Sequence, residues 1–166
     1  MLKFIQATAC VATLAAIGLT DPADAVTATG SLNVTIVITK TCAVGTSTPV
    51  DFGSVGLLTA NVDAAGDLSV TCTNGTTYDV GLSVGGGSGA TITDRKMTGP
   101  ASATITYHLF RDSGRTLNWG NTVSSDTLAG TGTGAAQSIP VYGRVASQAT
   151  PAPGTYNDTV TVTVTY

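Results

Sequence analysis

The last eleven residues of the chain alternate strictly between two kinds of side chain. Threonine fills most of the odd-numbered positions, and the even-numbered positions hold Tyr156, Asp158, Val160, Val162, Val164 and Tyr166. Such alternation predicts a β-strand with one buried face. A strand also needs a partner along each edge, or a device that protects an open edge. The sequence therefore raises the question of which segment pairs with this last strand.

Short alternating segments separated by turn residues occur along the rest of the chain. They cover residues 31–42, 67–73, 77–84, 104–110, 116–119 and 138–145. The pair Asn74-Gly75 predicts a hairpin between two of them, and Pro140 predicts an edge strand or a bulge. The glycine-rich stretch Gly130–Gly134 lacks a lysine and is expected to be a flexible loop rather than a phosphate-binding loop. With no Glu and only 10% charged residues, the composition predicts an all-β sandwich.

The first 25 residues have the pattern of a secretory signal peptide. Lys3 precedes an apolar run, and the small residues Ala23 and Ala25 end the segment, so cleavage is expected after Ala25. The chain is therefore expected to be secreted. The net charge of −3 at pH 7 favours neither nucleic acid nor an anionic membrane as a partner.

Removal of the signal peptide would also remove Cys10 and leave two cysteines, Cys42 and Cys72. In an oxidising compartment this pair predicts one disulfide bond. A metal site needs more ligands than two distant cysteines and one histidine supply. We therefore expect neither a metal nor a cofactor.

Residues after Cys42 supply about six strands, one fewer than the seven of a constant-type immunoglobulin sandwich. The segment 26–41 is in turn longer than one strand needs, and its even-numbered positions from 32 to 38 hold Leu32, Val34, Ile36 and Ile38. The missing strand and the surplus N-terminal segment together suggest strand addition, in which the first strand of one molecule completes the sandwich of another. The accepting edge would be the last strand, through Val160, Val162, Val164 and Tyr166.

Several motifs together resemble the spore coat protein U family, which includes the Csu-type, or archaic, chaperone-usher pilus subunits. They include "TGSLNVTIVITKTCAVG", "GDLSVTCTNGTTYDVGL", "YHLFRDSGRT", "IPVYGRV" and "PGTYNDTVTVTVTY", and the similarity extends over the mature chain. The resemblance implies an incomplete immunoglobulin-like β-sandwich completed by donor-strand exchange, with a disulfide between Cys42 and Cys72. It also implies a donor segment at about 27–38, a periplasmic chaperone and an outer-membrane usher as partners, and polymerisation with like subunits.

We accordingly expect a signal peptide at 1–25, a donor strand and the start of the first core strand at 26–41, and a pilin-like sandwich at 42–166. The expected function is that of a secreted structural subunit of a pilus or surface coat, serving adhesion and biofilm formation. The chain is short for a tip adhesin with a second domain, which favours a shaft or minor subunit.

The alternative is a monomeric secreted carbohydrate-binding sandwich, with Trp119, Tyr107 and Tyr142 as a platform for sugar rings. An enzyme is not expected, because the single histidine, His108, lies in a strand whose pattern is structural.

Overall fold

The computed structural model describes residues 24–166. Most of the expected signal peptide, 1–25, therefore lies outside the described residues. The chain divides between Ile36 and Val37 into two units. Residues 24–41 contain no helix or strand, and all of them are exposed. The strands, all in the second unit, are β1 (Cys42–Val44), β2 (Val62–Cys72), β3 (Thr77–Leu82), β4 (Arg95–Thr98), β5 (Thr104–Phe110), β6 (Leu128–Thr131), β7 (Ala136–Val145) and β8 (Val162–Thr165), with a short 3₁₀ helix, η1 (Pro100–Ser102), before β5.

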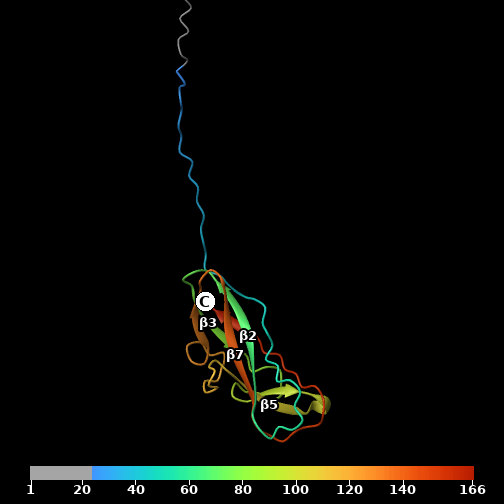
Figure 1. Cartoon of the computed structure of the whole chain (residues 1–166). Coiled ribbons are helices and arrows are strands. Elements are labelled where there is room, and N and C mark those ends of the chain that lie inside the picture. Colours follow the sequence, from blue (N-terminus) through green and yellow to red (C-terminus); the bar gives the residue numbers. More distant parts are fainter. Residues whose placement is uncertain (1–23) are drawn as a thin grey trace, which may run out of the picture. The chain divides into compact units, whose positions relative to one another are not determined.

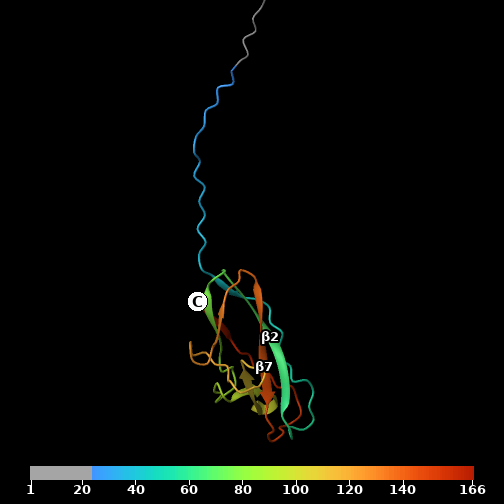
Figure 2. The same ribbon diagram turned by 60° about the vertical axis from the view of Figure 1, so that its left-hand side comes forward.

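The strands form two antiparallel sheets. One has the order β1-β2-β7-β5-β4, and the other has the order β6-β3-β8. The long pair β2 and β7 forms the centre of the first sheet, with a register that runs from Val62 opposite Val145 to Thr71 opposite Ala136. Figures 1 and 2 show these two strands side by side in both views.

The core lies between the sheets because one face of each strand is apolar. Along β2, Leu68, Val70 and Cys72 are buried, whereas the residues between them are more exposed. The loop after β5 adds Trp119, which is fully buried and whose Nε1–H donates to the carbonyl of Val80 at 2.8 Å. The other core residues that belong to strands come from both sheets: Tyr78, Val80, Leu82, Tyr107, Leu109, Ile139, Val141 and Val145.

The Asn74-Gly75 turn does not form the predicted hairpin. Gly75 has a φ of 76°, as a tight turn requires, but the strands on either side belong to different sheets. The residue types Asn74 and Gly75 determine only the local turn. Which strands pair with each other depends on where each strand buries its apolar face. Because β2 and β3 both pack on the core, the chain crosses from one sheet to the other at this turn.

The structure also differs from the prediction in the number of strands and in the position of the strand that contains Pro140. The strands β4 and β6 were not expected, and residues 116–119 form only an isolated bridge between Phe110 and Asn118. The strand β7 is not an edge, since it lies between β2 and β5. Its pairing with β5 covers only Tyr142–Arg144, so Pro140 has a partner strand on the β2 side alone and is unpaired on its other edge. A strand residue without an N–H is tolerated at such a locally open edge.

Candidate functional site

Within the described residues 24–166, two strands at the open side of the sandwich each have a partner along only one edge. The strand β8 pairs with β3, from Val162 opposite Leu82 to Thr165 opposite Asp79, and β1 pairs only with β2. Cα atoms of β1 and β8 come within 8 Å of each other, yet no ladder joins the two strands within the described residues. The sandwich is therefore open along this side.

A groove of about 1180 Å³ continues between the two chain segments that extend from these edges. One wall is 49–58, which follows β1 in sequence, and the other is 150–158, which leads into β8. Its floor belongs to the core side of the sheets and consists of Val62, Met97, Ile105, Tyr107 and Val145. The groove thus exposes part of the apolar interior.

The predicted acceptor residues lie along the open edge, but only some of them are in the strand itself. Val162 and Val164 belong to β8, and together with Val160 they are half-buried against the core. Tyr166 lies beyond the strand and is 58% exposed. The apolar face of this segment points inward as the alternation predicts. No partner strand from the part of the chain that the structure describes lies along its free backbone edge.

Sequence reasoning missed the other wall of the groove. Val50 and Phe52 pack against the core, and Leu58 is buried. These residues follow turn-forming Pro49 and flank Gly53, so they show no sustained alternation that would mark a strand. The apolar residues in a segment between two turns were the only available signal.

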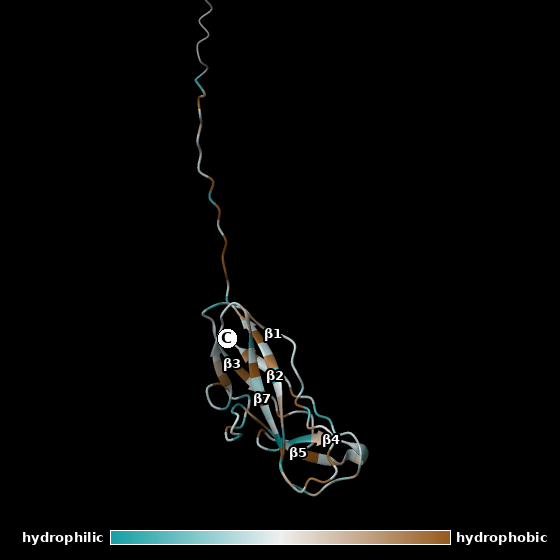
Figure 3. Ribbon diagram, viewed as in Figure 1, coloured by the Kyte–Doolittle hydropathy of each residue, from teal (hydrophilic) through white to brown (hydrophobic). Residues whose placement is uncertain are grey.

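The segment 24–38, called the N-terminal arm below, carries an exposed apolar face. The predicted donor residues Leu32, Val34, Ile36 and Ile38 are 87%, 88%, 82% and 72% exposed. Figure 3 shows the hydrophobic colour along the end of the arm that precedes β1. Contiguous exposed aliphatic groups of this kind mark an interaction surface in soluble proteins.

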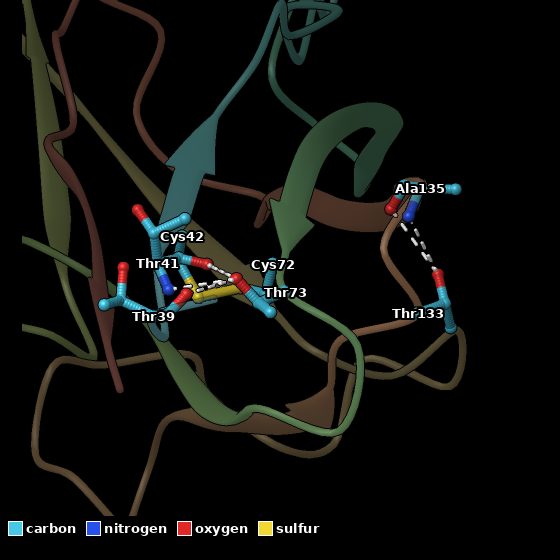
Figure 4. The surroundings of a disulfide bond; sticks show 7 residues. All are labelled: Thr39, Thr41, Cys42, Cys72, Thr73, Thr133 and Ala135. Carbon is cyan, nitrogen blue, oxygen red and sulfur yellow. Dashed lines mark hydrogen bonds between the residues drawn. A yellow bond between two sulfur atoms is a disulfide. The ribbon is translucent and has the colours of Figure 1, made fainter. Parts of the chain in front are cut away.

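The disulfide joins the first two strands. Cys42 opens β1, Cys72 closes β2, and the two sulfur atoms are bonded across the directly opposed pair (Figure 4). Thr73, directly after Cys72, donates its backbone N–H to the carbonyl of Thr41 at 2.9 Å. The chain that leaves the sandwich toward the arm is thus fixed to β2 at this point.

One polar pair borders the groove. The Tyr107 hydroxyl donates to Asp158 Oδ2 at 2.6 Å, and the backbone N–H of Gly86 donates to Asp158 Oδ1 at 2.7 Å. Burial of the Tyr107 hydroxyl raises its pKa above the ordinary value, and the hydrogen bond to Asp158 raises the pKa further. The hydroxyl and the carboxylate thus have hydrogen-bond partners within the protein. Their role is structural, because they hold the segment that leads into β8 in place.

The residues weighed for other functions have structural surroundings. Trp119 is fully buried and Tyr107 is 5% exposed, so the sugar-binding platform with Tyr142 is wrong. His108 Nδ1 makes a short contact with the carbonyl of Thr93. Among residues 24–166, no three His, Cys, Asp or Glu side chains are grouped to hold a metal ion. Within the same described part, no helix has the length and hydrophobicity needed to span a bilayer.

Comparison with solved structures gives the fold. A chain in the crystal structure of the CsuC–CsuE chaperone–tip adhesion subunit pre-assembly complex, from the archaic chaperone-usher Csu pili of Acinetobacter baumannii, matches with a TM-score of 0.53 at 20% identity. The match covers 78% of this chain and 40% of that one, which is less than half of its length. Together with the open edges of β1 and β8, the likeness confirms the predicted all-β, incomplete immunoglobulin-like sandwich.

Comparison of sequences gives the family. The family model described as Spore Coat Protein U domain matches residues 28–163, a range that contains most of the N-terminal arm and all of the strands except the last two residues of β8. Protein U of Myxococcus xanthus is 36% identical over 174 residues, in an alignment that covers 96% of this chain and 97% of that protein. Because both matches extend over nearly the whole sequence, this chain belongs to the spore coat protein U family.

Proposed function

We propose that the chain is a secreted structural subunit of a chaperone-usher pilus or surface coat, assembled by donation of the N-terminal arm. In this proposal the arm of one molecule enters the groove beside β8 of another molecule. The observation that carries the proposal is that one chain contains an exposed apolar strand sequence, an open sheet edge at β8, and a groove bounded by the segment 150–158 that leads into β8. The arm has a strand sequence but no strand to pair with among the described residues, and the free edge of β8 has no partner strand there, so the arm of one molecule can pair with β8 of another.

The four donor side chains supply enough energy to hold such a joint. Moving one large aliphatic side chain from water into an apolar groove contributes about 1.5 to 3 kcal/mol. Four of them, Leu32, Val34, Ile36 and Ile38, contribute roughly 6 to 12 kcal/mol before ordering costs. Backbone hydrogen bonds to β8 would add register, because a shift by one residue would turn Asn33, Thr35 and Thr39 toward the groove instead.

The route to assembly follows from the exposed apolar surface. An empty apolar groove and an unpaired apolar arm would both promote aggregation of the subunit during export. A periplasmic chaperone that lends a strand would cover the groove, and an outer-membrane usher would receive the subunit. The likeness in fold to a chain of a chaperone–subunit pre-assembly complex supports this route. In our proposal the signal peptide is 1–25, the donor and the start of the first core strand are 26–41, and the accepting sandwich is 42–166.

The assembled fibre or coat would act in adhesion and biofilm formation at the cell surface. These roles require a repeated, exposed surface rather than a catalytic group, and we propose no enzymatic activity. The donor residues proposed are the four aliphatic groups of the arm. The acceptor edge proposed is Val160, Val162, Val164 and Tyr166.

A pair of substitutions in adjacent residues tests the proposal. Ile36→Asp places a carboxylate on the donor face, whereas Thr35→Asp places the same charge on the opposite face. Burying an unpaired carboxylate in an apolar groove costs several kcal/mol in addition to the lost aliphatic contact. We expect Ile36→Asp to reduce surface polymer at least about 100-fold, which corresponds to about 2.7 kcal/mol per joint. Electron microscopy and immunoblots of the surface fraction of the native host measure this.

Thr35→Asp is the matched control and should leave most of the polymer in place. Both variants should still form the Cys42–Cys72 disulfide, because the arm lies outside the sandwich that the disulfide joins. If polymer forms equally well with Asp on either face, the arm is not the donor and the proposal is wrong.

A further inference from the structure

Thr73 makes more contacts with the start of the N-terminal arm than strand pairing requires. Its Oγ1 accepts from the backbone N–H of Thr41 at 3.1 Å and donates to the carbonyl of Thr39 at 3.2 Å. Its own N–H donates to the carbonyl of Thr41 at 2.9 Å. Figure 4 shows these contacts around the Thr73 hydroxyl, beside the disulfide. The side chain therefore continues the hydrogen bonding of β1 and β2 beyond the last backbone pair, Cys42 opposite Cys72.

The turn that carries Thr73 is itself held in place by the glycine-rich stretch Gly130–Gly134. Gly75 N–H donates to the carbonyl of Gly132 at 2.9 Å, and Gly132 N–H donates to the carbonyl of Thr76 at 2.8 Å. A Cβ on Gly132 would lie 2.5 Å from the Thr73 carbonyl oxygen, so only glycine permits this approach. The stretch that was expected to be a flexible loop is instead a support for the turn after β2.

The anchored point lies directly after the last donor residue. Val37 and Ile38 are 79% and 72% exposed and Thr39 is exposed as well, but Thr39 is the first residue that the Thr73 hydroxyl contacts. No residue separates Ile38 from this contact. Each residue released from the anchor would add about 3.3 Å of loose chain between the arm and the sandwich.

We propose that Thr73 is a positioning residue that anchors the root of the N-terminal arm and so sets the boundary between donated arm and sandwich. The inference rests on the proposed function, and it adds that the donated segment ends at Ile38. With the root fixed, a strand seated in a neighbouring molecule connects to its own sandwich without slack. Successive subunits are then held in a defined relative orientation, and the joint is stiff.

The test compares Thr73→Val, Thr73→Ser and Thr77→Val in the mature chain purified from its host. Valine keeps the shape of threonine and removes the hydroxyl, and serine restores it. Thr77 begins β3 after the same turn, is exposed and makes no side-chain hydrogen bond within the described residues, so its change is the matched control. We expect the Thr41 amide to exchange hydrogen at least about tenfold faster in Thr73→Val only. Filaments of this variant should bend more, with a persistence length at least about twofold shorter.

A role limited to fold stability would accelerate exchange throughout the sandwich, including the amides of β2 and β7. The proposal requires the change to be confined to residues 37–42 and to be reversed by serine. If Thr73→Val fails to fold, the wild-type chain still tests the anchor, because its Thr41 amide should exchange more slowly than the intrinsic rate of an unstructured amide. Exchange of the wild-type Thr41 amide at that intrinsic rate overturns the anchor, as does unchanged Thr41 exchange in a folded Thr73→Val. A wild-type chain with a protected Thr41 that forms no filaments would instead overturn the proposed function.

Discussion

The burial of Arg95 is the feature at the residue scale that the sequence pattern predicts least well. Its guanidinium is fully buried and donates to the carbonyls of Leu82, Ser83, Ile92 and Trp119 at 2.6 to 3.2 Å. Burial lowers its pKa below the ordinary value, and the charges of Tyr107, Asp158 and Asp126 oppose this change. The side chain ties the end of β3 to the chain before β4 and to the loop that carries Trp119. A cation in this position is tolerated because all of its bonding partners are carbonyl oxygens.

Tyr107 predicts a loss of stability in alkali. Its folded-state pKa is raised by burial and by the hydrogen bond to Asp158, so the folded chain keeps this proton after the unfolded chain has lost it. The contribution to stability is complete below the ordinary tyrosine pKa of about 10. It decreases above that pH by about 1.4 kcal/mol per pH unit, until the folded pKa is reached.

Urea unfolding of the mature chain between pH 8 and pH 11, with Tyr107→Phe as the comparison, measures this effect. The difference in stability between wild type and Tyr107→Phe should shrink above pH 10, since groups other than Tyr107 titrate alike in both proteins. A constant difference across this range would mean that the Tyr107 pKa is not raised on folding.

The disulfide predicts a second effect at this scale. The bond closes a loop with a sequence separation of 30 residues, which corresponds to roughly 3 to 4 kcal/mol in the chain-entropy account. The double substitution Cys42→Ala with Cys72→Ala should lower the free energy of unfolding by about this amount, as measured by urea unfolding. Reductant should destabilise wild type and leave the double variant unchanged; equal unfolding midpoints for oxidised and reduced wild type would contradict the prediction.

At the scale of elements, the alternation of side chains identified the strands with a clear apolar face. The predicted range 104–110 equals β5, and β3 and β7 differ from their predicted ranges by two residues at one end. The strands β4 and β6 have four residues each and mixed polarity, so no periodicity identifies them. Pairing was harder to predict than strand existence, because the Asn74-Gly75 turn joins strands of different sheets.

The position of β8 predicts the result of a truncation. Val162 and Val164 cover the core, and β3 lies between β6 and β8 in the smaller sheet. Removal of Val162–Tyr166 would expose the core and leave β3 with β6 as its only partner strand. We therefore expect the truncated chain not to accumulate in soluble form, as measured by immunoblot of periplasmic extracts. Removal of Tyr166 alone, which lies outside β8, is the control and should be tolerated; an abundant, soluble long truncation would contradict the role of β8.

At the scale of the whole molecule, the sequence predicted both parts of the proposed joint but not their boundaries. The exposed even-numbered residues of the arm and the inward-facing residues of the last segment follow from period-two alternation. The wall 49–58 has no such period, and the anchor at Thr73 depends on the spatial proximity of β1 and β2. Local patterns therefore identified the surfaces, whereas tertiary contacts set the shape of the groove and the end of the arm.

The central claim is that the N-terminal arm of one molecule fills the groove of another. Electron cryo-microscopy of the polymer from the native host tests it most directly. The account predicts that residues 32–38 of each subunit lie along β8 of a neighbour, with Leu32, Val34, Ile36 and Ile38 directed into its core. A polymer in which the arm remains exposed, or lies in the groove of its own subunit, would contradict the account.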